Sequence, residues 1–194
     1  MPLPEIPLGP GASRIESINA GVRTMPTEYA QDRIGAGELP PPSALLRAFR
    51  EPVESNRRKH RVLAAARELV ECHERRQHAL QAAHDPTASS GRVAACSQLV
   101  EDIDGHRAKL VGSIDDWVAA NVVHRTGASL HTETLGAVID RMAAKWIAAQ
   151  QVLDVEPQQN GEVHRQWSKL AELADGYRDL IIDVTEHRRR LPVW

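Results

Sequence analysis

The stretch HTETLGAVIDRMAAKWIAAQQVL, residues 131–153, decides the fold that we expect for this chain. Its apolar side chains recur three or four positions apart, which is the spacing of one face of an α-helix. Glu133 and Asp140 fall together on the opposite face, at about 100° of rotation per residue. The stretch therefore predicts an amphipathic helix with an apolar side and a carboxylate-bearing side. The apolar side is made by Leu135, Ile139, Met142, Trp146, Ala149 and Leu153.

Outward from this stretch, the sequence is helical in pattern almost throughout from Ser43. A first long helix begins between Ala44 and Ser55 and ends at the breaker-rich turn of residues 85–91. A second helix follows and ends near Val122. The apolar seam of the first helix consists of Val62, Ala66, Leu69 and Leu80, with His73 among them, and the seam of the second consists of Val93, Cys96, Leu99, Ile103, Leu110, Ile114 and Trp117.

The third and fourth helices share the same seam spacing. Thr132 has the short polar side chain of an N-cap for the third helix, which runs to about Val155. Residues 156–161 break the pattern before the fourth helix. No alternating strand pattern and no internal repeat is found, so the predicted fold class is all-α, an antiparallel bundle of about four long helices. The seam of the fourth helix is Val163, Trp167, Leu170, Ala174, Tyr177, Ile181 and Val184. From these seams we expect Trp117, Trp146 and Trp167 all to face the core.

Residues 1–43 differ in composition from residues 44–194, which we expect to form the bundle domain. The first segment holds most of the prolines, many glycines and few large apolar side chains, so it cannot bury enough surface to fold alone. Two interpretations remain: a disordered leader, or an extended arm that docks on its own bundle or on a partner.

The second and third helices carry charged side chains on matching faces. Asp104, Arg107 and Asp115 share one side of the second helix, so Arg107 can reach Glu133 or Asp140 across the interface. An interhelical ion-pair network and a binding site for a polar ligand are both consistent with this pattern. The candidate site residues are Asp104, Arg107, Glu133, Asp140 and Arg141.

Four glycines lie inside predicted helices, where each costs roughly 1 kcal/mol relative to alanine. They are Gly105, Gly112, Gly136 and Gly176. Close helix crossing would explain them, and so would room for a ligand or a partner side chain.

Several kinds of chemistry lack their usual spacing. The histidines His73 and His78 are five residues apart, which turns them about 140° from each other rather than onto one metal-binding face. No glutamate has a histidine three residues later, as a di-iron bundle requires, so we expect no metal and no cofactor. No nucleophile elbow or phosphate-binding glycine-rich loop is found either, which leaves catalysis uncertain.

Basic residues form two clusters, and one of them is a possible contact patch. Residues 188–190 are three arginines at the end of a helix, where cations complement the helix dipole. The other cluster lacks interleaved aromatic residues, which makes nucleic acid an unlikely partner. It consists of Arg57, Arg58, Lys59 and Arg61, with His60 between them.

Composition points to a bacterial or phage protein of the cytoplasm. The 24 Lys and Arg residues nearly balance 26 Asp and Glu residues, so no global field attracts nucleic acid or membrane. Cys72 and Cys96 have neither metal-ligand nor disulfide-framework spacing, which indicates a reducing compartment. No apolar run approaches the roughly 20 residues of a membrane span, and we expect no signal sequence.

Three blocks of the sequence resemble a bacterial helical family, domain of unknown function 4254. The first block runs from Val93 to Asp115, the second from Thr132 to Arg141, and the third from Leu170 to Leu180. Asp104 stands where the family usually has Asn, and Leu135 where it has Pro. The resemblance implies a helical fold and no established activity.

These observations favour a helical interaction or regulatory module that docks on itself, as a homo-oligomer, or on a protein partner. The alternative is a small-molecule-binding protein or enzyme with a carboxylate and arginine site between the second and third helices. Burial and pairing of the candidate site residues distinguish the two, because charges that saturate one another leave no capacity for a ligand.

Overall fold

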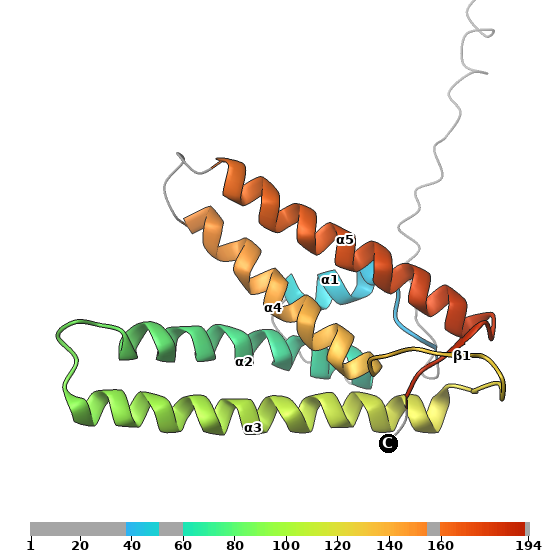
Figure 1. The fold of residues 1–194 in the computed structure, drawn as a ribbon, viewed down its shortest axis with the longest axis horizontal. Helices are drawn as coiled ribbons and strands as arrows, with labels where there is room; N and C mark the ends of the chain where they lie inside the picture. The colour runs from blue at the N-terminus through green and yellow to red at the C-terminus, as the bar shows by residue number, and fades with distance from the viewer. Residues whose placement is uncertain (1–37, 51–59, 155–159, 193–194) are drawn as a thin grey trace, which may run out of the picture. The chain divides into compact units, whose positions relative to one another are not determined.

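The computed structural model describes residues 38–50, 60–154 and 160–192. Within these ranges the chain is mostly helical, as the sequence predicts, with one pair of very short parallel strands (Figure 1). The elements are α1 (Pro42–Arg50), α2 (Arg61–Ala83), α3 (Ser90–Asn121), β1 (Ser129–Leu130), α4 (Leu135–Asp154), α5 (Asn160–Thr185) and β2 (Arg189–Arg190).

Helices α2 and α3 form an antiparallel hairpin around the predicted turn. The carboxylate of Asp85 accepts hydrogen bonds from the backbone N–H and the hydroxyl of Thr87, at 2.9 and 2.7 Å, which closes the turn. The hydroxyl of Ser89 then accepts the N–H of Arg92 at 3.3 Å and caps α3. Local polar chemistry therefore fixes where α2 ends and α3 begins.

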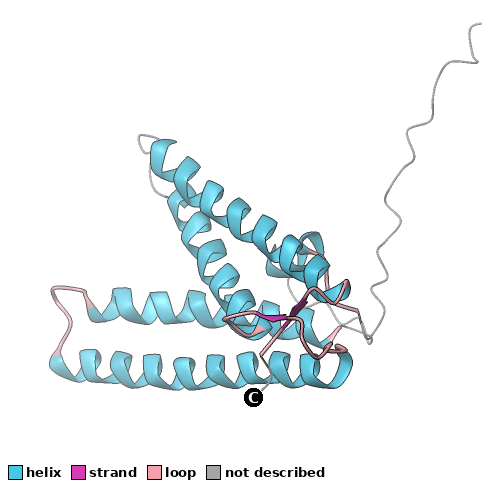
Figure 2. Ribbon diagram, turned by 45° about the vertical axis from the view of Figure 1, so that its right-hand side comes forward, coloured by secondary structure: helices cyan, strands magenta, loops and turns pink. Residues whose placement is uncertain are grey.

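Helix α4 packs on both helices of the hairpin, and α5 packs on α4. The α4–α5 pair crosses the α2–α3 hairpin obliquely, as the two ribbon views show (Figures 1 and 2). The predicted all-α class is confirmed. The predicted antiparallel four-helix bundle is not confirmed by this arrangement. The core where these helices meet includes the fully buried Leu69, Ile114, Ile139 and Met142.

The first predicted helix is two helices in the structure. Helix α1 ends at Arg50 and α2 begins only at Arg61, later than the expected start between residues 44 and 55. Helix α1 packs against α2 and α5 and buries Leu45 and Phe49. Its apolar residues therefore belong to a separate short helix. In the sequence, their pattern runs into the apolar seam of the longer helix that follows.

Most of the predicted arm, residues 1–37, lies outside the described residues. Its described end contacts the helical part of the chain, because the buried hydroxyl of Tyr177 donates a hydrogen bond to the carbonyl of Pro40 at 2.8 Å. Burial raises the pKa of this phenol, which stays neutral as a donor. The carbonyl of Pro41 accepts the N–H of Ala44 at 3.0 Å and so starts α1.

Helix α4 begins two residues later than the predicted cap suggested. Thr134, and not Thr132, is the capping residue, since its hydroxyl accepts the N–H of Ala137 at 3.2 Å. The carboxylate of Asp115 on α3 accepts the next free N–H, that of Gly136, at 2.8 Å. A cap supplied by another helix has no local sequence signature.

Gly136 is the one helical glycine among the predicted four that close packing explains. A Cβ atom there would lie 2.5 Å from the carbonyl oxygen of Val111, so α3 and α4 cross too closely for a side chain. At Gly105, Gly112 and Gly176, no atom of the described residues outside the helix's own backbone lies within 4 Å of the corresponding position. Close crossing among the described helices therefore does not account for those three.

Helix α5 ends in a Schellman motif without glycine. His187 has a φ of 57°, its N–H donates to the carbonyl of Val184, and the N–H of Arg188 donates to the carbonyl of Asp183. The chain then forms β2, whose carbonyl at Arg190 accepts the N–H of His131 at 2.8 Å. Strands of two residues are too short to show an alternating pattern, which is why the sequence did not predict them.

The three tryptophans differ in burial. Trp117 is buried in the core, as predicted. Trp146 is partly buried against the core, and Trp167 packs edge-on against Trp146 with 5.9 Å between ring centroids. Trp167 is half-buried, and its ring partner Trp146 in turn packs against the buried Phe49 with 6.1 Å between ring centroids, so Trp167 reaches the core only through Trp146. Three seam residues are also exposed: Val93, Leu99 and Leu153.

Candidate functional site

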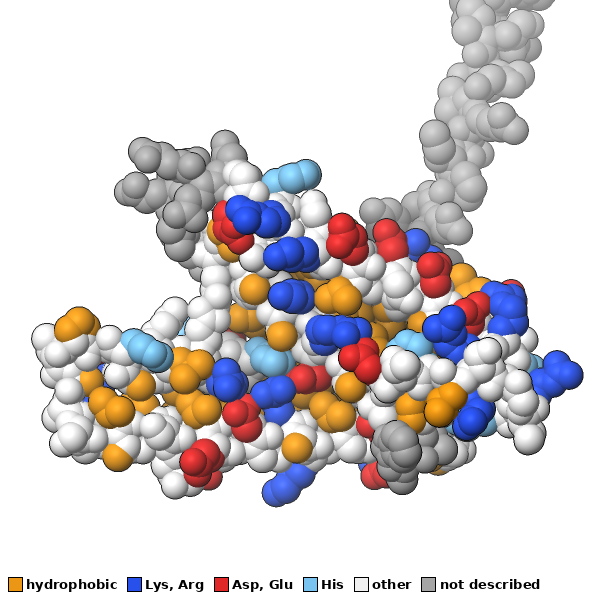
Figure 3. Space-filling model, in the orientation of Figure 1, with side chains coloured by type: hydrophobic (Ala, Val, Ile, Leu, Met, Phe, Trp, Pro, Cys, Tyr) orange, Lys and Arg blue, Asp and Glu red, His pale blue; other side chains and the backbone are white. Residues whose placement is uncertain are grey.

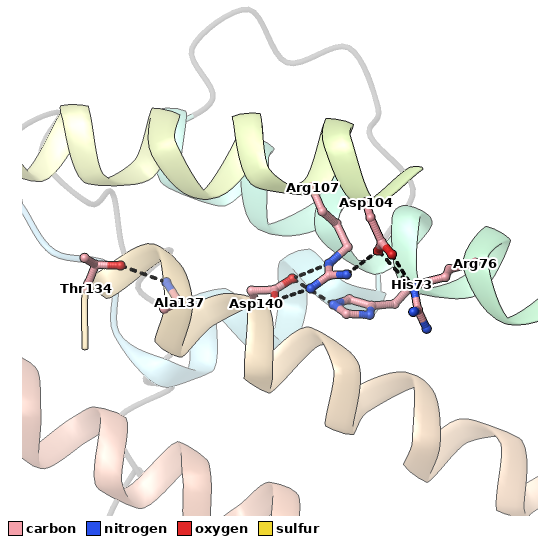
Figure 4. A network of polar contacts seen from close by, with 7 residues as sticks. All are labelled: His73, Arg76, Asp104, Arg107, Thr134, Ala137 and Asp140. Carbon is pink, nitrogen blue, oxygen red and sulfur yellow. Dashed lines mark hydrogen bonds and ion pairs between the residues drawn. The ribbon is translucent and has the colours of Figure 1, made fainter. Parts of the chain in front are cut away.

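Asp140 on α4 is the meeting point of three helices (Figure 4). Its Oδ1 accepts hydrogen bonds from His73 Nε2 on α2 at 2.8 Å and from Arg107 Nε on α3 at 3.0 Å. Its Oδ2 accepts a second bond from Arg107, at 2.9 Å. Because an ionised carboxylate only accepts hydrogen bonds, Nε2 of His73 carries the hydrogen. The guanidinium therefore grips Asp140 with two bonds and His73 adds a third.

A second carboxylate, Asp104, extends the network along α3. It accepts a hydrogen bond from the other arm of the Arg107 guanidinium at 2.5 Å and one from Arg76 Nε on α2 at 3.0 Å. Asp104 and Arg107 are three residues apart, so they are neighbours on one helix face. The network thus alternates in charge from Arg76 through Asp104 and Arg107 to Asp140, as the close view shows (Figure 4).

The Asp140 end of the network is the more buried one. The side chains of His73 and Asp140 are 12% and 16% exposed, against 37% for Asp104. Burial raises the pKa of the Asp140 carboxyl, but the hydrogen bonds from His73 and Arg107 outweigh burial and lower the pKa to about 2. The hydrogen bond to Asp140 in turn raises the pKa of Arg107. At neutral pH this carboxylate stays ionised and is a poor proton donor.

Pairing within the network leaves little capacity for a charged ligand. Two carboxylates face two guanidinium groups, and His73 donates to a carboxylate that Arg107 already holds. The formal charges of the two carboxylates and the two guanidinium groups therefore cancel. This geometry suits a structural connection among α2, α3 and α4 better than catalysis or ligand capture.

Glu133 and Arg141 form a separate ion pair outside this network. Their closest atoms are 2.7 Å apart, and the side chains are 38% and 45% exposed. Among the described residues, neither Glu133 nor Arg141 forms a hydrogen bond or an ion pair with Arg107. The sequence placed Arg107 within reach of Glu133 or Asp140, and the structure brings it to Asp140 alone.

Sequence reasoning missed the contribution of α2 to this network. The sequence placed His73 on the apolar seam of its helix and did not single out Arg76. Their spacing of three residues places both on one helix face, but nothing in α2 shows that this face meets α3 and α4. Asp115, predicted to share the face of Arg107, caps α4 instead. Burial raises the pKa of the Asp115 carboxyl. Hydrogen bonds from Gly136 and Thr134 lower this pKa and so partly offset the effect of burial.

The basic clusters have different placements. Three members of the predicted contact patch, residues 57–59, lie outside the described residues, and Arg61 is exposed at the start of α2. At the end of α5, Arg188 and Arg189 both form ion pairs with Asp183, and Arg188 also pairs with Glu186. Those two arginines are thus neutralised locally.

Two other features of the described residues bear on function. No group of three or more His, Cys, Asp and Glu side chains in the described ranges is placed to hold a metal ion. In the same ranges, the helices are too short or too polar to cross a membrane.

Comparison with known proteins finds one match. No curated protein and no solved structure matches the chain. A family model described as protein of unknown function (DUF4254) matches residues 63–193, which include nearly all of α2, the whole of α3, α4 and α5, and Asp140 with every residue bonded to it. The chain therefore belongs to the DUF4254 family.

Proposed function

We propose that this protein is a helical interaction module that docks on itself or on a protein partner in the bacterial cytoplasm. The observation that carries the proposal is an apolar surface on the outer half of the α2–α3 hairpin, beyond the part that α4 covers. Val93 is 37% exposed there although it occupies a seam position of α3. The space-filling view shows hydrophobic side chains gathered at this end of the hairpin (Figure 3).

The charged network supports this interpretation indirectly. Because Asp104, Arg107 and Asp140 neutralise one another and their partners, the ligand site that the alternative function needs has no unpaired charge at its centre. The same bonds hold the hairpin firmly to α4. A rigid hairpin with an uncovered apolar end is suited to binding another helical surface.

The proposal also covers the cellular compartment and the N-terminal arm. Both cysteines are free thiols, which suits a reducing cytoplasm. We propose that residues 1–37, the part of the proline-rich segment 1–43 that lies outside the described residues, act as a binding arm toward a partner, since their sequence favours extended docking over independent folding.

Copurification tests the proposed function. The tagged full-length chain is recovered from its native host, and bound proteins are identified by mass spectrometry alongside the oligomeric state of the chain. We expect self-association or a specific partner that Val100→Glu on the hairpin removes and Ala95→Glu, on the far side of α3, leaves in place. A chain that remains monomeric and enriches the same proteins as an unrelated tagged control contradicts the proposal.

A further inference from the structure

His60 holds the segment before α1 to the start of α2. Its Nε2 donates a hydrogen bond to the backbone carbonyl of Glu38 at 2.8 Å, and His60 is the residue that immediately precedes α2. Two residues after Glu38, the carbonyl of Pro40 accepts the hydroxyl of Tyr177 on α5. Two side chains from separate parts of the chain thus hold one short stretch, residues 38–41, which we call the anchor segment. It joins residues 1–37 to α1.

The two bonds to the anchor segment respond differently to pH. Burial raises the pKa of Tyr177, so its hydroxyl remains a neutral donor at neutral and acidic pH. An imidazole, in contrast, changes its charge in the range between about pH 5 and 8. Mild acid can therefore alter the bond from His60 while the bond from Tyr177 stays as it is.

The surroundings of the His60 ring favour its neutral form. The ring lies against the buried Trp117 of α3, with 4.7 Å between ring centroids and 59° between ring planes. Because a carbonyl oxygen only accepts, Nε2 carries the hydrogen and Nδ1 is bare in the neutral ring. Nδ1 is enclosed and has no hydrogen-bond partner among the described residues. Protonation would leave an enclosed N–H at this position without an acceptor.

The charged residues next to this contact do not compensate for that cost. Glu38 in the anchor segment, Arg61 on α2 and Asp116 on α3 are all exposed, and Lys59, which precedes His60 in the sequence, lies outside the described residues. Burial lowers the pKa of His60, and the bond to the Glu38 carbonyl opposes this effect only in part. A charged ring is therefore more stable in water than in this site.

We propose that His60 is a pH-sensitive latch: when its imidazole takes up a proton, the ring leaves Trp117 and the Glu38 carbonyl, and the N-terminal end of the anchor segment is released. The proton comes from solvent and adds to Nδ1. The bond from Tyr177 still holds Pro40, so the release is local and α1 stays in place. The inference concerns this chain alone and holds whether or not a partner binds.

The latch gives a direction for stability. The pKa of His60 is lower in the folded chain than its ordinary value of 6.5. The stability that the neutral ring contributes is thus fully present above pH 6.5 and is lost as the pH falls through the folded-state pKa. The corresponding loss from Asp140 occurs between 3.8 and about 2, so the two effects are separable.

Nuclear magnetic resonance of the full-length chain tests the latch directly. The ring signal of His60, assigned through the neighbouring Arg61, should titrate with a midpoint below 6.5. The backbone amide signals of Glu38 and Leu39 should shift with the same midpoint, because they report release of the anchor segment. A midpoint at or above 6.5 would mean that attraction of the charged ring to Trp117 outweighs burial, and it overturns the proposal.

Two glutamine variants test whether His60 causes this response. His60→Gln offers an amide N–H to the same carbonyl but takes up no proton, so the Glu38 and Leu39 signals should no longer respond to mild acid. His84→Gln is the matched control, because the exposed His84 at the other end of α2 also contacts a backbone carbonyl, that of Leu80, at 2.6 Å. It should keep the wild-type response. A response that persists in His60→Gln overturns the latch.

Urea denaturation provides a second measurement, which does not need assigned signals. Between about pH 7.5 and 5.5, the unfolding equilibrium constant of the wild type should rise relative to that of His60→Gln, by at most about tenfold per pH unit for a single proton. His84→Gln should follow the wild type. A ratio between wild type and His60→Gln that stays constant over this range overturns the inference.

Discussion

At the scale of single residues, Asp140 connects three helices through one carboxylate. Replacing it with asparagine removes the charge that Arg107 and His73 share, while both remain partly buried. We expect Asp140→Asn to lower the free energy of unfolding by about 2–3 kcal/mol, less than for a fully buried pair. Glu133→Gln is the matched control, because its exposed pair with Arg141 should contribute less than roughly 1 kcal/mol. Urea denaturation that gives equal losses for the two variants contradicts this ranking.

The same carboxylate predicts a pH dependence. The pKa of Asp140 is lowered from 3.8 to about 2 in the folded chain, so the folded state favours the ionised form. The resulting stability is fully present above the unfolded pKa of 3.8 and is lost as pH falls through about 2. A shift of this size corresponds to about 2 kcal/mol. We expect the wild-type free energy of unfolding to approach that of Asp140→Asn as denaturation is repeated from pH 5 down to about 2. A constant difference over this range would exclude Asp140 as the cause.

The residue scale also shows where sequence reasoning stops. The faces of α3 and α4 placed Arg107 near Asp140 because helical periodicity fixes which residues share a side. Periodicity does not state which face of α2 meets them, so Arg76 could not be assigned. Periodicity also does not decide whether Arg107 pairs with Glu133 or with Asp140, since that depends on how α3 and α4 cross.

At the scale of secondary-structure elements, the α3–α4 crossing depends on one missing side chain. Gly136→Ala would push a Cβ atom to 2.5 Å from the Val111 carbonyl, and we expect a loss of about 2 kcal/mol in stability. Gly105→Ala is the opposite case, because its Cβ meets nothing within 4 Å and alanine favours the helix by roughly 1 kcal/mol. Thermal unfolding should therefore move in opposite directions for the two substitutions. A rise for both would mean that the helices separate at little cost.

The end of α5 offers a stabilising substitution. His187 adopts a left-handed backbone with φ of 57°, which glycine tolerates without a Cβ penalty. We expect His187→Gly to raise stability by about 0.5–1 kcal/mol in chemical denaturation. His84, at the end of α2 with φ of −87°, is the control, and His84→Gly should bring no gain. Destabilisation by His187→Gly would indicate that the imidazole itself contributes to the cap.

Elements were predictable in proportion to their length. The seams of α3, α4 and α5 extend over several turns, so their existence and approximate ends follow from apolar spacing. Helix α1 has nine residues, and its pattern merged with that of α2. The β1–β2 pair is set by tertiary contact between the chain segments after α3 and after α5, which no local pattern records.

At the scale of the whole molecule, the arm is the part whose role remains a prediction. We expect deletion of residues 1–37 to preserve the helical circular-dichroism spectrum and the thermal transition, because the contact between Pro40 and Tyr177 is retained. Capture of a protein partner should be lost. Pull-down with the shortened chain tests this. Unfolding on deletion would make the arm part of the core, and unchanged capture would make it a leader.

The arrangement of the helices could not be predicted from their seams. Apolar faces show that α2 to α5 must pack together, but they do not set the crossing angle. The oblique crossing follows from contacts such as Gly136 on Val111 and Arg107 on Asp140, which involve pairs of helices and a backbone atom. It leaves the outer half of the α2–α3 hairpin uncovered by α4 (Figure 1).

The hydrogen bond between Tyr177 and Pro40 has a consequence for the order of folding. It joins residues 137 apart in the chain, whereas the cap from Asp115 to Gly136 joins residues only 21 apart. Closing the longer loop loses more chain entropy, so we expect α3 and α4 to meet early and the segment at Pro40 to reach α5 last. Contacts that form last are also the first to open in local unfolding. The amide hydrogen of Ala44, which is bonded to the carbonyl of Pro41 beside this contact, should therefore exchange with solvent before those of α3 and α4.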